Sequence, residues 1–206
     1  MSSHLARPAR RRLVPALVLA IAIVAALVYW RTSANADAGP SGAAPYDDPQ
    51  SAGAITLCSA DGKAATEGSV DDRPFAAVAL GATGLPSDLD PTGAVATLFA
   101  YQPREGVSAS EFSGTAISAA GVQADAAHPA FVVPEDAWSI GDFVTAYPAD
   151  FDGYVQLRLY LGTPAAGTLS DQPYDTADLR VDGDRWELVG AGSASCTAAT
   201  QTTEEN

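Results

Sequence analysis

The sequence contains few of the side chains on which metal binding and nucleophilic catalysis depend. Its 206 residues include two histidines, two cysteines and one lysine, Lys63. A zinc site needs three or four His, Cys or carboxylate ligands at suitable spacing. A Ser-His-Asp hydrolase needs a serine in a recognisable setting, and the chain has no G-x-S-x-G motif. We therefore expect neither chemistry, and we expect His128, which precedes a proline, to lie in a loop.

Positive charge is also scarce, and it is distributed unevenly along the chain. Five of the eleven Lys and Arg residues lie at or before Arg31, whereas all twenty-five Asp and Glu residues lie from Asp37 onward. The chain beyond Arg31 therefore has a formal charge of −19, from six basic and twenty-five acidic residues. Such a charge repels nucleic acid and anionic lipid. We expect no nucleic-acid partner, and we expect partners that are neutral molecules, cationic molecules or metal ions.

One long apolar segment is present, residues 13–30, with the sequence LVPALVLAIAIVAALVYW. It begins at Leu13, ends at Trp30 and contains no charged residue. As a helix it would be about 27 Å long, close to the roughly 30 Å hydrocarbon thickness of a bilayer. Four arginines precede it and one follows it, which favours a cytoplasmic basic segment at residues 1–12 and an external C-terminal domain. We predict a single-pass protein of the cell membrane, anchored through this segment.

A cleaved signal sequence is the alternative interpretation of the same segment. Residues 34–36 supply the small side chains of a cleavage site, so that cutting after Ala36 would release a secreted protein. The apolar segment is longer than a usual signal sequence and ends in Tyr29 and Trp30, as membrane anchors do. Residues 31–53 are small, polar and interrupted by proline, so we predict a flexible tether there.

The two cysteines, Cys58 and Cys196, lie near the two ends of the external part. An even pair of cysteines in an extracytoplasmic domain favours a disulfide. We expect this bond to join the first strand of the domain to the last. Because it closes a loop of more than a hundred residues, it should stabilise the fold by about 4 to 5 kcal/mol.

Short apolar stretches between Gly, Pro and Asp residues predict β-strands at 54–58, 75–80, 94–101 and 154–161. The last stretch alternates strictly, which predicts one buried face and one exposed face. The apolar face consists of Val155, Leu157, Leu159 and Leu161, and the polar face of Gln156, Arg158 and Tyr160. Residues 179–188 predict a hairpin with Asp182 and Gly183 in a two-residue type I′ turn.

A short helix is predicted to follow Ser139, which is a favoured N-cap residue with Asp142 three positions later. Trp138 and Phe143 stand where a hydrophobic staple would place them, and Pro148 disfavours a helical conformation for the residue before it. We expect Trp138, like Trp186 of the hairpin, to lie in the core.

Together these elements predict an all-β domain over residues 54–198. We expect an antiparallel β-sandwich of immunoglobulin-like type, preceded by one N-terminal transmembrane helix. A small barrel is the alternative, because strand periodicity does not separate the two folds. Residues 199–206 are polar and are expected to form a disordered tail.

Two sets of residues are candidate sites. The polar strand face of Gln156, Arg158 and Tyr160 would present a ring beside polar groups, a surface that suits carbohydrate binding. Acidic turn residues supply the oxygen ligands that calcium prefers, so calcium is the one possible cofactor. These candidate ligands are Asp150, Asp152, Asp182 and Asp184, with Asp88 and Asp90 as a further fragment. None follows the order of an EF-hand, and aspartate also occurs in turns for backbone reasons.

Four stretches of the external part resemble those of anchored or secreted envelope proteins from high-GC actinobacteria. They are residues 69–75 (SVDDRPF), 97–104 (TLFAYQPR), 127–129 (AHP) and 152–161 (DGYVQLRLYL). The resemblance implies a cell-envelope protein with an immunoglobulin-like outer domain, and it carries over no catalytic residue.

We therefore expect an extracytoplasmic module of the cell envelope, without enzymatic activity, that binds another envelope component, either a protein or a wall polymer. The alternative is a secreted or anchored hydrolase that uses acidic residues, because twenty-five are present.

Overall fold

The computed structural model describes residues 42–123, 128–190 and 192–198. The chain divides into two units at residue 40, and all described residues belong to the second. The predicted membrane segment at 13–30, the cleavage site after Ala36 and the predicted tail at 199–206 lie outside the described residues. Within the described part, no helix is long and apolar enough to cross a bilayer.

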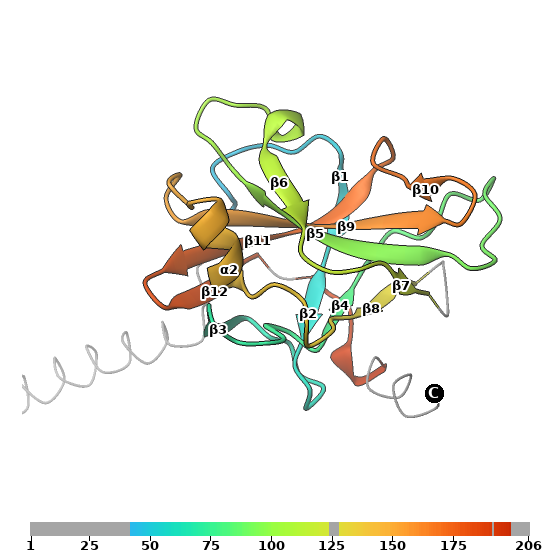
Figure 1. Cartoon of the computed structure of the whole chain (residues 1–206), viewed down its shortest axis with the longest axis horizontal. Coiled ribbons are helices and arrows are strands. Elements are labelled where there is room, and N and C mark those ends of the chain that lie inside the picture. Colours follow the sequence, from blue (N-terminus) through green and yellow to red (C-terminus); the bar gives the residue numbers. More distant parts are fainter. Residues whose placement is uncertain (1–41, 124–127, 191, 199–206) are drawn as a thin grey trace, which may run out of the picture. The chain divides into compact units, whose positions relative to one another are not determined.

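The described unit consists mainly of short β-strands (Figure 1). In chain order its elements are β1 (Ser51–Ala54), β2 (Thr56–Cys58), β3 (Glu67–Ser69), β4 (Val78–Leu80), β5 (Val95–Gln102), the 3-10 helix η1 (Ala109–Glu111), β6 (Ser113–Ala116), β7 (Gly121–Val122), β8 (Ala130–Val132), α2 (Ile140–Ala146), β9 (Tyr154–Thr163), β10 (Gly167–Thr168), β11 (Tyr174–Asp182), β12 (Arg185–Val189) and the 3-10 helix η2 (Cys196–Ala198).

The strands form two sheets of unequal size. The large sheet has the order β3-β12-β11-β9-β5-β6, with β1 beside β11, β10 beside β9 and β7 beside β5. The small sheet has the order β2-β4-β8. Every pairing is antiparallel except that of β1 with β11. The prediction of an all-β, sandwich-like fold is confirmed at this level.

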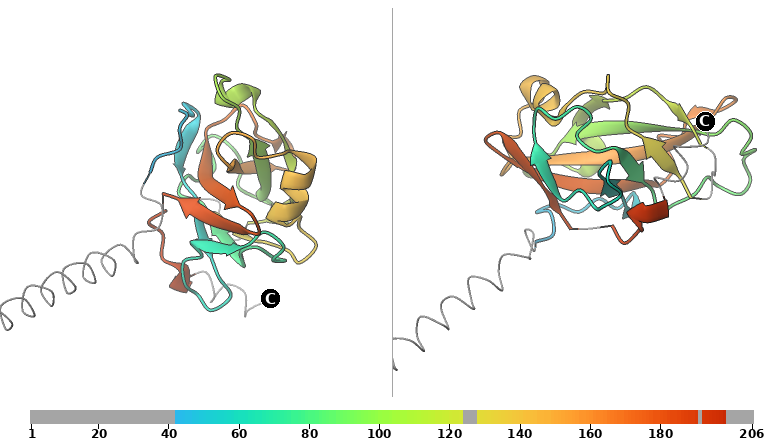
Figure 2. Two further views of the ribbon diagram at one scale, coloured as in Figure 1. Left: turned by 90° about the vertical axis from the view of Figure 1, so that its left-hand side faces the viewer. Right: turned by 90° about the horizontal axis from the view of Figure 1, so that it is seen from below.

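The hydrophobic core lies between the two sheets, and α2 closes part of it (Figure 2). On the large sheet Leu157 of β9 stands opposite Ala100 of β5 and Ala177 of β11, and all three are buried. The small sheet contributes Leu57 and Phe131 to the same cluster. The predicted apolar face of β9 is therefore the face that packs against the small sheet.

Local sequence signals correctly predicted the start of α2. The hydroxyl of Ser139 accepts a hydrogen bond from the backbone N–H of Asp142, and the Asp142 carboxylate accepts one from the N–H of Ser139. Phe143 and Trp186 are fully buried, as expected. The prediction for Trp138 was wrong, because this side chain is 39% exposed. The residue before an N-cap lies outside the helix, so its side chain need not follow the buried helix face.

The β11–β12 hairpin forms, but its turn differs from the predicted one. Asp182 pairs with Arg185, so Gly183 and Asp184 are the two turn residues. Only Gly183 has a positive φ, of 60°, which is the pattern of a type II′ turn with glycine first. Leu179 consequently pairs with Leu188, two positions further along β12 than the predicted turn would place it. Because a shift of two positions keeps every side chain on its face of the sheet, Val181 and Trp186 still share one face.

The predicted disulfide between Cys58 and Cys196 is confirmed, with 5.6 Å between the two Cα atoms. Cys58 ends β2, but Cys196 begins the 3-10 helix η2, so the bond does not join the first strand to the last. It fastens the C-terminal segment to the small sheet.

Candidate functional site

The three residues predicted as an exposed binding face are buried instead. Gln156, Arg158 and Tyr160 do share the face of β9 opposite the core, but they are only 1%, 3% and 4% exposed. Two segments cover this face. One is residues 42–54, which we call the N-terminal strap, and the other is the connection between β5 and β6, where the Ala109 carbonyl accepts a hydrogen bond from Arg158.

The N-terminal strap corrects the predicted boundary of the domain. The sequence assigned residues 31–53 to a flexible tether, yet Tyr46 packs edge-on against Phe112, at 5.3 Å between ring centroids. Residues 51–54 form β1, which pairs with the first half of β11. The ordering entropy of this polar segment is offset by strand pairing and by specific polar contacts, because the segment has little apolar surface to bury.

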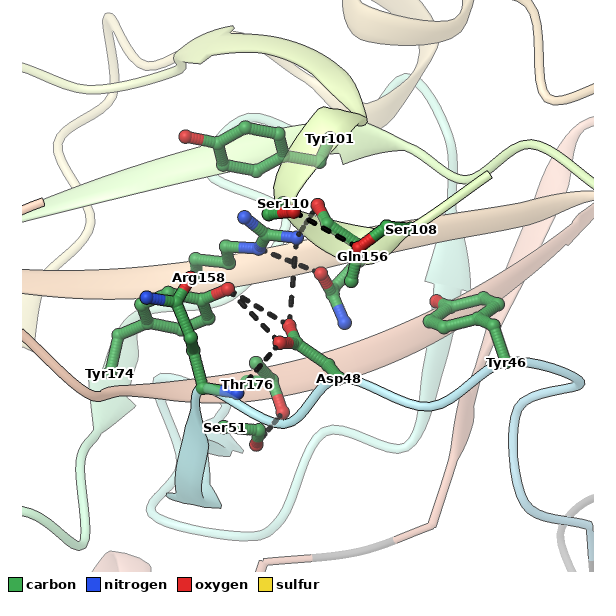
Figure 3. A network of polar contacts seen from close by, with 12 residues as sticks. Tyr46, Asp48, Ser51, Tyr101, Ser108, Ser110, Gln156, Arg158, Tyr174 and Thr176 are labelled. Carbon is green, nitrogen blue, oxygen red and sulfur yellow. Dashed lines mark hydrogen bonds and ion pairs between the residues drawn. The ribbon is translucent and has the colours of Figure 1, made fainter. Parts of the chain in front are cut away.

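The centre of the covered face is an ion pair between Arg158 and Asp48 of the strap (Figure 3). Their nearest nitrogen and oxygen are 3.5 Å apart, and the two side chains are 3% and 6% exposed. The Tyr174 hydroxyl lies 3.1 Å and 3.0 Å from the two oxygens of the Asp48 carboxylate and donates to it. The Arg158 guanidinium lies 4.0 Å from the Tyr101 ring centroid and 4.7 Å from that of Tyr174.

This arrangement satisfies a charge that would otherwise be costly to bury. The Nε–H of Arg158 donates to the side-chain oxygen of Gln156 at 2.7 Å. A planar guanidinium stacks well on aromatic rings, and a buried charge needs both a counter-ion and hydrogen bonds. Because the strap closes the site and Asp48 occupies it, the residues act in this structure as a fastening between the strap and the sheet.

A second carboxylate, Asp178 of β11, lies on the same face. It accepts a hydrogen bond of 2.5 Å from the Tyr46 hydroxyl. Burial is the main cause that raises the pKa of Asp178, and the nearby Asp48 charge raises it further. Burial also raises the pKa of Tyr46, so the phenol keeps the proton that it donates. Two carboxylates thus hold the strap to the large sheet. Asp48 belongs to the strap and pairs with Arg158 of the sheet, and Asp178 belongs to the sheet and accepts from Tyr46 of the strap.

The structure does not gather the candidate calcium ligands Asp150, Asp152, Asp182 and Asp184 into a metal site. Among the described residues there is no group of three or more His, Cys, Asp or Glu side chains that could hold a metal ion. Asp152 has a positive φ of 51°, which aspartate tolerates in turns, and its carbonyl accepts a hydrogen bond from Arg180. Asp150, Asp152 and Asp184 lie in turns, and Asp182 ends β11 opposite Arg185.

The other predicted residues of chemical interest also lie in turns or bends. The side chain of Asp90 accepts a hydrogen bond from the backbone N–H of Thr92, as in other aspartate turns. His128 lies in an exposed bend, as predicted.

An open cleft lies at one end of the large sheet, where β9 ends and β11 begins. It has a volume of about 220 Å³ and is lined by Thr83, Gly84, Pro86, Leu161, Leu169, Gln172 and Pro173. The loop before β5 and the hairpin that carries β10 lie side by side at this end, on the right in Figure 1. A Cβ atom built on Gly93 would lie 3.1 Å from Cγ of Pro164, so the two segments touch.

A buried carboxylate holds one wall of this cleft in place. Asp175 is 2% exposed, and it accepts hydrogen bonds from the backbone N–H groups of Ala82 and Thr83, at 2.6 Å and 2.8 Å. The hydroxyl of Thr83 donates to the same carboxylate at 2.6 Å. Sequence reasoning singled out neither Asp175 nor the loop at residues 81–93. Asp175 is one of three aspartates in β11, so its identity alone gave no signal.

No protein-family model, curated protein or solved structure matches this chain.

Proposed function

We propose that the chain is an extracytoplasmic module of the cell envelope that binds another envelope component through the cleft at the β9–β11 end. The observation that carries this proposal is the cleft itself. It opens to solvent, its walls are mostly apolar, and Asp175 holds one of them in position. The face of Gln156 and Arg158, by contrast, is closed by the N-terminal strap.

The size and lining of the cleft favour recognition over turnover. Sites for whole small molecules usually enclose about 300–1,000 Å³, whereas this cleft encloses about 220 Å³. It therefore suits one side chain or one unit of a larger ligand. No lining residue carries a titratable side chain. Glycoside hydrolysis by acidic residues usually needs two carboxyl groups beside the reacting bond, so the cleft gives no support to the alternative of a hydrolase that uses acidic residues.

The location outside the membrane is part of the same proposal. It is supported by the apolar segment at 13–30, by the arginines that precede it and by the acidic composition of all that follows. The disulfide between Cys58 and Cys196 also favours an oxidising compartment. Retention of the anchor gives a single-pass membrane protein, and cleavage after Ala36 gives a secreted one.

The immunoglobulin-like type of the sandwich stays a prediction. Its support is the resemblance of four sequence stretches to actinobacterial envelope proteins. Sheets of nine strands and three strands count against it, because immunoglobulin domains divide seven to nine strands more evenly.

The proposal is tested by retention of the oxidised full chain, in detergent micelles, on two surfaces. One is washed, protein-stripped envelope polymer, and the other is a column of immobilised, detergent-solubilised membrane proteins. The matched variants are Leu169→Ser in the cleft and Val132→Ser, which changes an exposed apolar residue outside the cleft lining. We expect retention on one surface that Leu169→Ser removes and Val132→Ser preserves. Absence of retention on both surfaces, or equal retention of both variants, would contradict the proposal.

A further inference from the structure

The two loop segments that supply most of the cleft lining carry negative charge and no positive charge. Residues 81–93 contain Asp88 and Asp90, residues 164–173 contain Asp171, and neither segment contains Lys or Arg. All three aspartates are exposed. Asp171 is adjacent in sequence to the lining residue Gln172, and Asp88 is two positions from the lining residue Pro86. We call these three exposed aspartates the acidic surround of the apolar cleft.

One carboxylate of this acidic surround, that of Asp90, is stabilised in its charged form. The backbone N–H of Thr92 donates a hydrogen bond of 2.9 Å to the carboxylate of Asp90, which lowers the pKa of that group. The six basic residues of the external part lie elsewhere in the sequence, at Lys63, Arg73, Arg104, Arg158, Arg180 and Arg185. No basic side chain of these two segments offsets the negative charge, so an anionic ligand would meet repulsion here.

We propose that the cleft takes an apolar side chain from a protein segment in which Lys or Arg residues flank that side chain. This inference rests on the proposed function and names the chemical class of its partner. Leu161, Leu169 and Pro173 would contact the apolar side chain, which fits the small volume of the cleft. The exposed amide of Gln172 lies at the lining and suits a hydrogen bond to the peptide backbone of the partner.

The acidic residues give this interaction its selectivity. Contacts between exposed charges are individually weak, but complementary charge steers association and rejects partners of the wrong sign. A neutral or anionic polymer gains nothing from Asp88 and Asp171, whereas a basic segment gains at both. Binding is consequently expected to weaken as salt is added, because exposed charges are screened at a Debye length of about 8 Å near physiological ionic strength.

Three short peptides, acetylated and amidated at their ends, separate these contributions. GKGLGKG carries one leucine between two lysines, GEGLGEG reverses the charge, and GKGSGKG removes the apolar side chain. Each is titrated into the ¹⁵N-labelled full chain in detergent micelles, and the amide signals of Thr83, Gly84 and Leu169 are followed. We expect saturable shifts of these signals with GKGLGKG, and weaker or undetectable shifts with the other two peptides.

Variants of the chain test the same two contributions. Asp171→Lys should weaken binding of GKGLGKG by about two- to tenfold, from the loss of one exposed ion pair and its replacement by repulsion. Asp182→Lys makes the same change in charge at the exposed end of β11, next to the β11–β12 turn, and it should leave the affinity unchanged. Leu169→Ser should remove saturable binding.

Equal shifts with GEGLGEG, no shifts with GKGLGKG, or an equal effect of the two lysine variants would overturn the inference. Its failure is distinguishable from failure of the proposed function. If stripped polymer retains the chain in a manner that depends on Leu169, while GKGLGKG leaves the cleft signals unchanged, the module binds through the cleft but its partner is not a basic protein segment.

Discussion

Replacement of Asp48 by asparagine should remove most of the fastening between the N-terminal strap and the large sheet. Asparagine keeps the shape of the side chain and can still accept a hydrogen bond from the Tyr174 hydroxyl. It leaves the buried guanidinium of Arg158 without its ion-pair partner. The perturbation therefore isolates one charge in a site that is closed to water.

The magnitude follows from the distance and the burial of the pair. At 3.5 Å, two unit charges in an effective dielectric of about 20 attract by about 5 kcal/mol. Removal of one partner from a buried pair usually costs about 3–5 kcal/mol. Because the amide keeps one hydrogen bond and Asp178 also lies near Arg158, we expect a loss close to 3 kcal/mol. For a domain of this size that loss lowers the melting temperature by about 6–12 °C.

The assay is urea denaturation of the full chain in detergent micelles, followed by tryptophan fluorescence. Asp47→Asn is the matched control, because it makes the same change one residue away at an exposed side chain. It should change the free energy of unfolding by less than about 0.5 kcal/mol. Equal free energies of unfolding for the two variants, within about 1 kcal/mol, would refute the ion pair as the fastening of the strap.

The remaining predictions concern other parts of the same unit. Burial raises the folded-state pKa of Asp178. The stability that its neutral form contributes is therefore present below the unfolded pKa of about 3.9 and is lost as pH rises through the folded value. Asp178→Asn should gain stability relative to the natural chain as pH rises above about 4, and parallel pH profiles of the two proteins would argue against a raised pKa. Reduction of the Cys58–Cys196 disulfide should lower the free energy of unfolding by about 4 to 5 kcal/mol. In the denatured but unreduced chain neither cysteine should react with a thiol reagent. Labelling of both cysteines would show that the isolated protein lacks the bond. Ser139→Ala removes the N-cap of α2 and should cost about 1 kcal/mol in urea denaturation, and no change would show that the cap does not contribute.

Features that depend on neighbouring residues could be predicted from the sequence. Strict alternation placed Leu157 and Arg158 on opposite faces of β9, and the Ser139 and Asp142 pair gave the start of α2. Two cysteines in a domain expected outside the cytoplasm gave the disulfide. The residues that predict β9 and α2 lie within these elements or next to them. Two cysteines allow only one disulfide.

Features that depend on distant segments could not be predicted. A polar strand face is exposed in most sheets, whereas Arg158 is buried because the N-terminal strap with Asp48 and the β5–β6 connection with Ala109 cover it. The one hint was Tyr46, the only aromatic residue between positions 31 and 53. The cleft depends on the conformation of two loops and on the hydrogen bonds that Asp175 accepts, neither of which has a periodic signal.

The central claim is that this module binds its partner through the cleft. The most direct test is photo-crosslinking of the full chain in intact cells, with a benzophenone amino acid in place of Gln172 at the cleft or of Asp182 at the end of β11. We predict an adduct with an envelope component, either a protein or a polymer, from position 172 that Leu169→Ser abolishes, and none from position 182. An adduct from position 182 alone, an adduct from 172 that Leu169→Ser leaves unchanged, or no adduct from either position would contradict the claim.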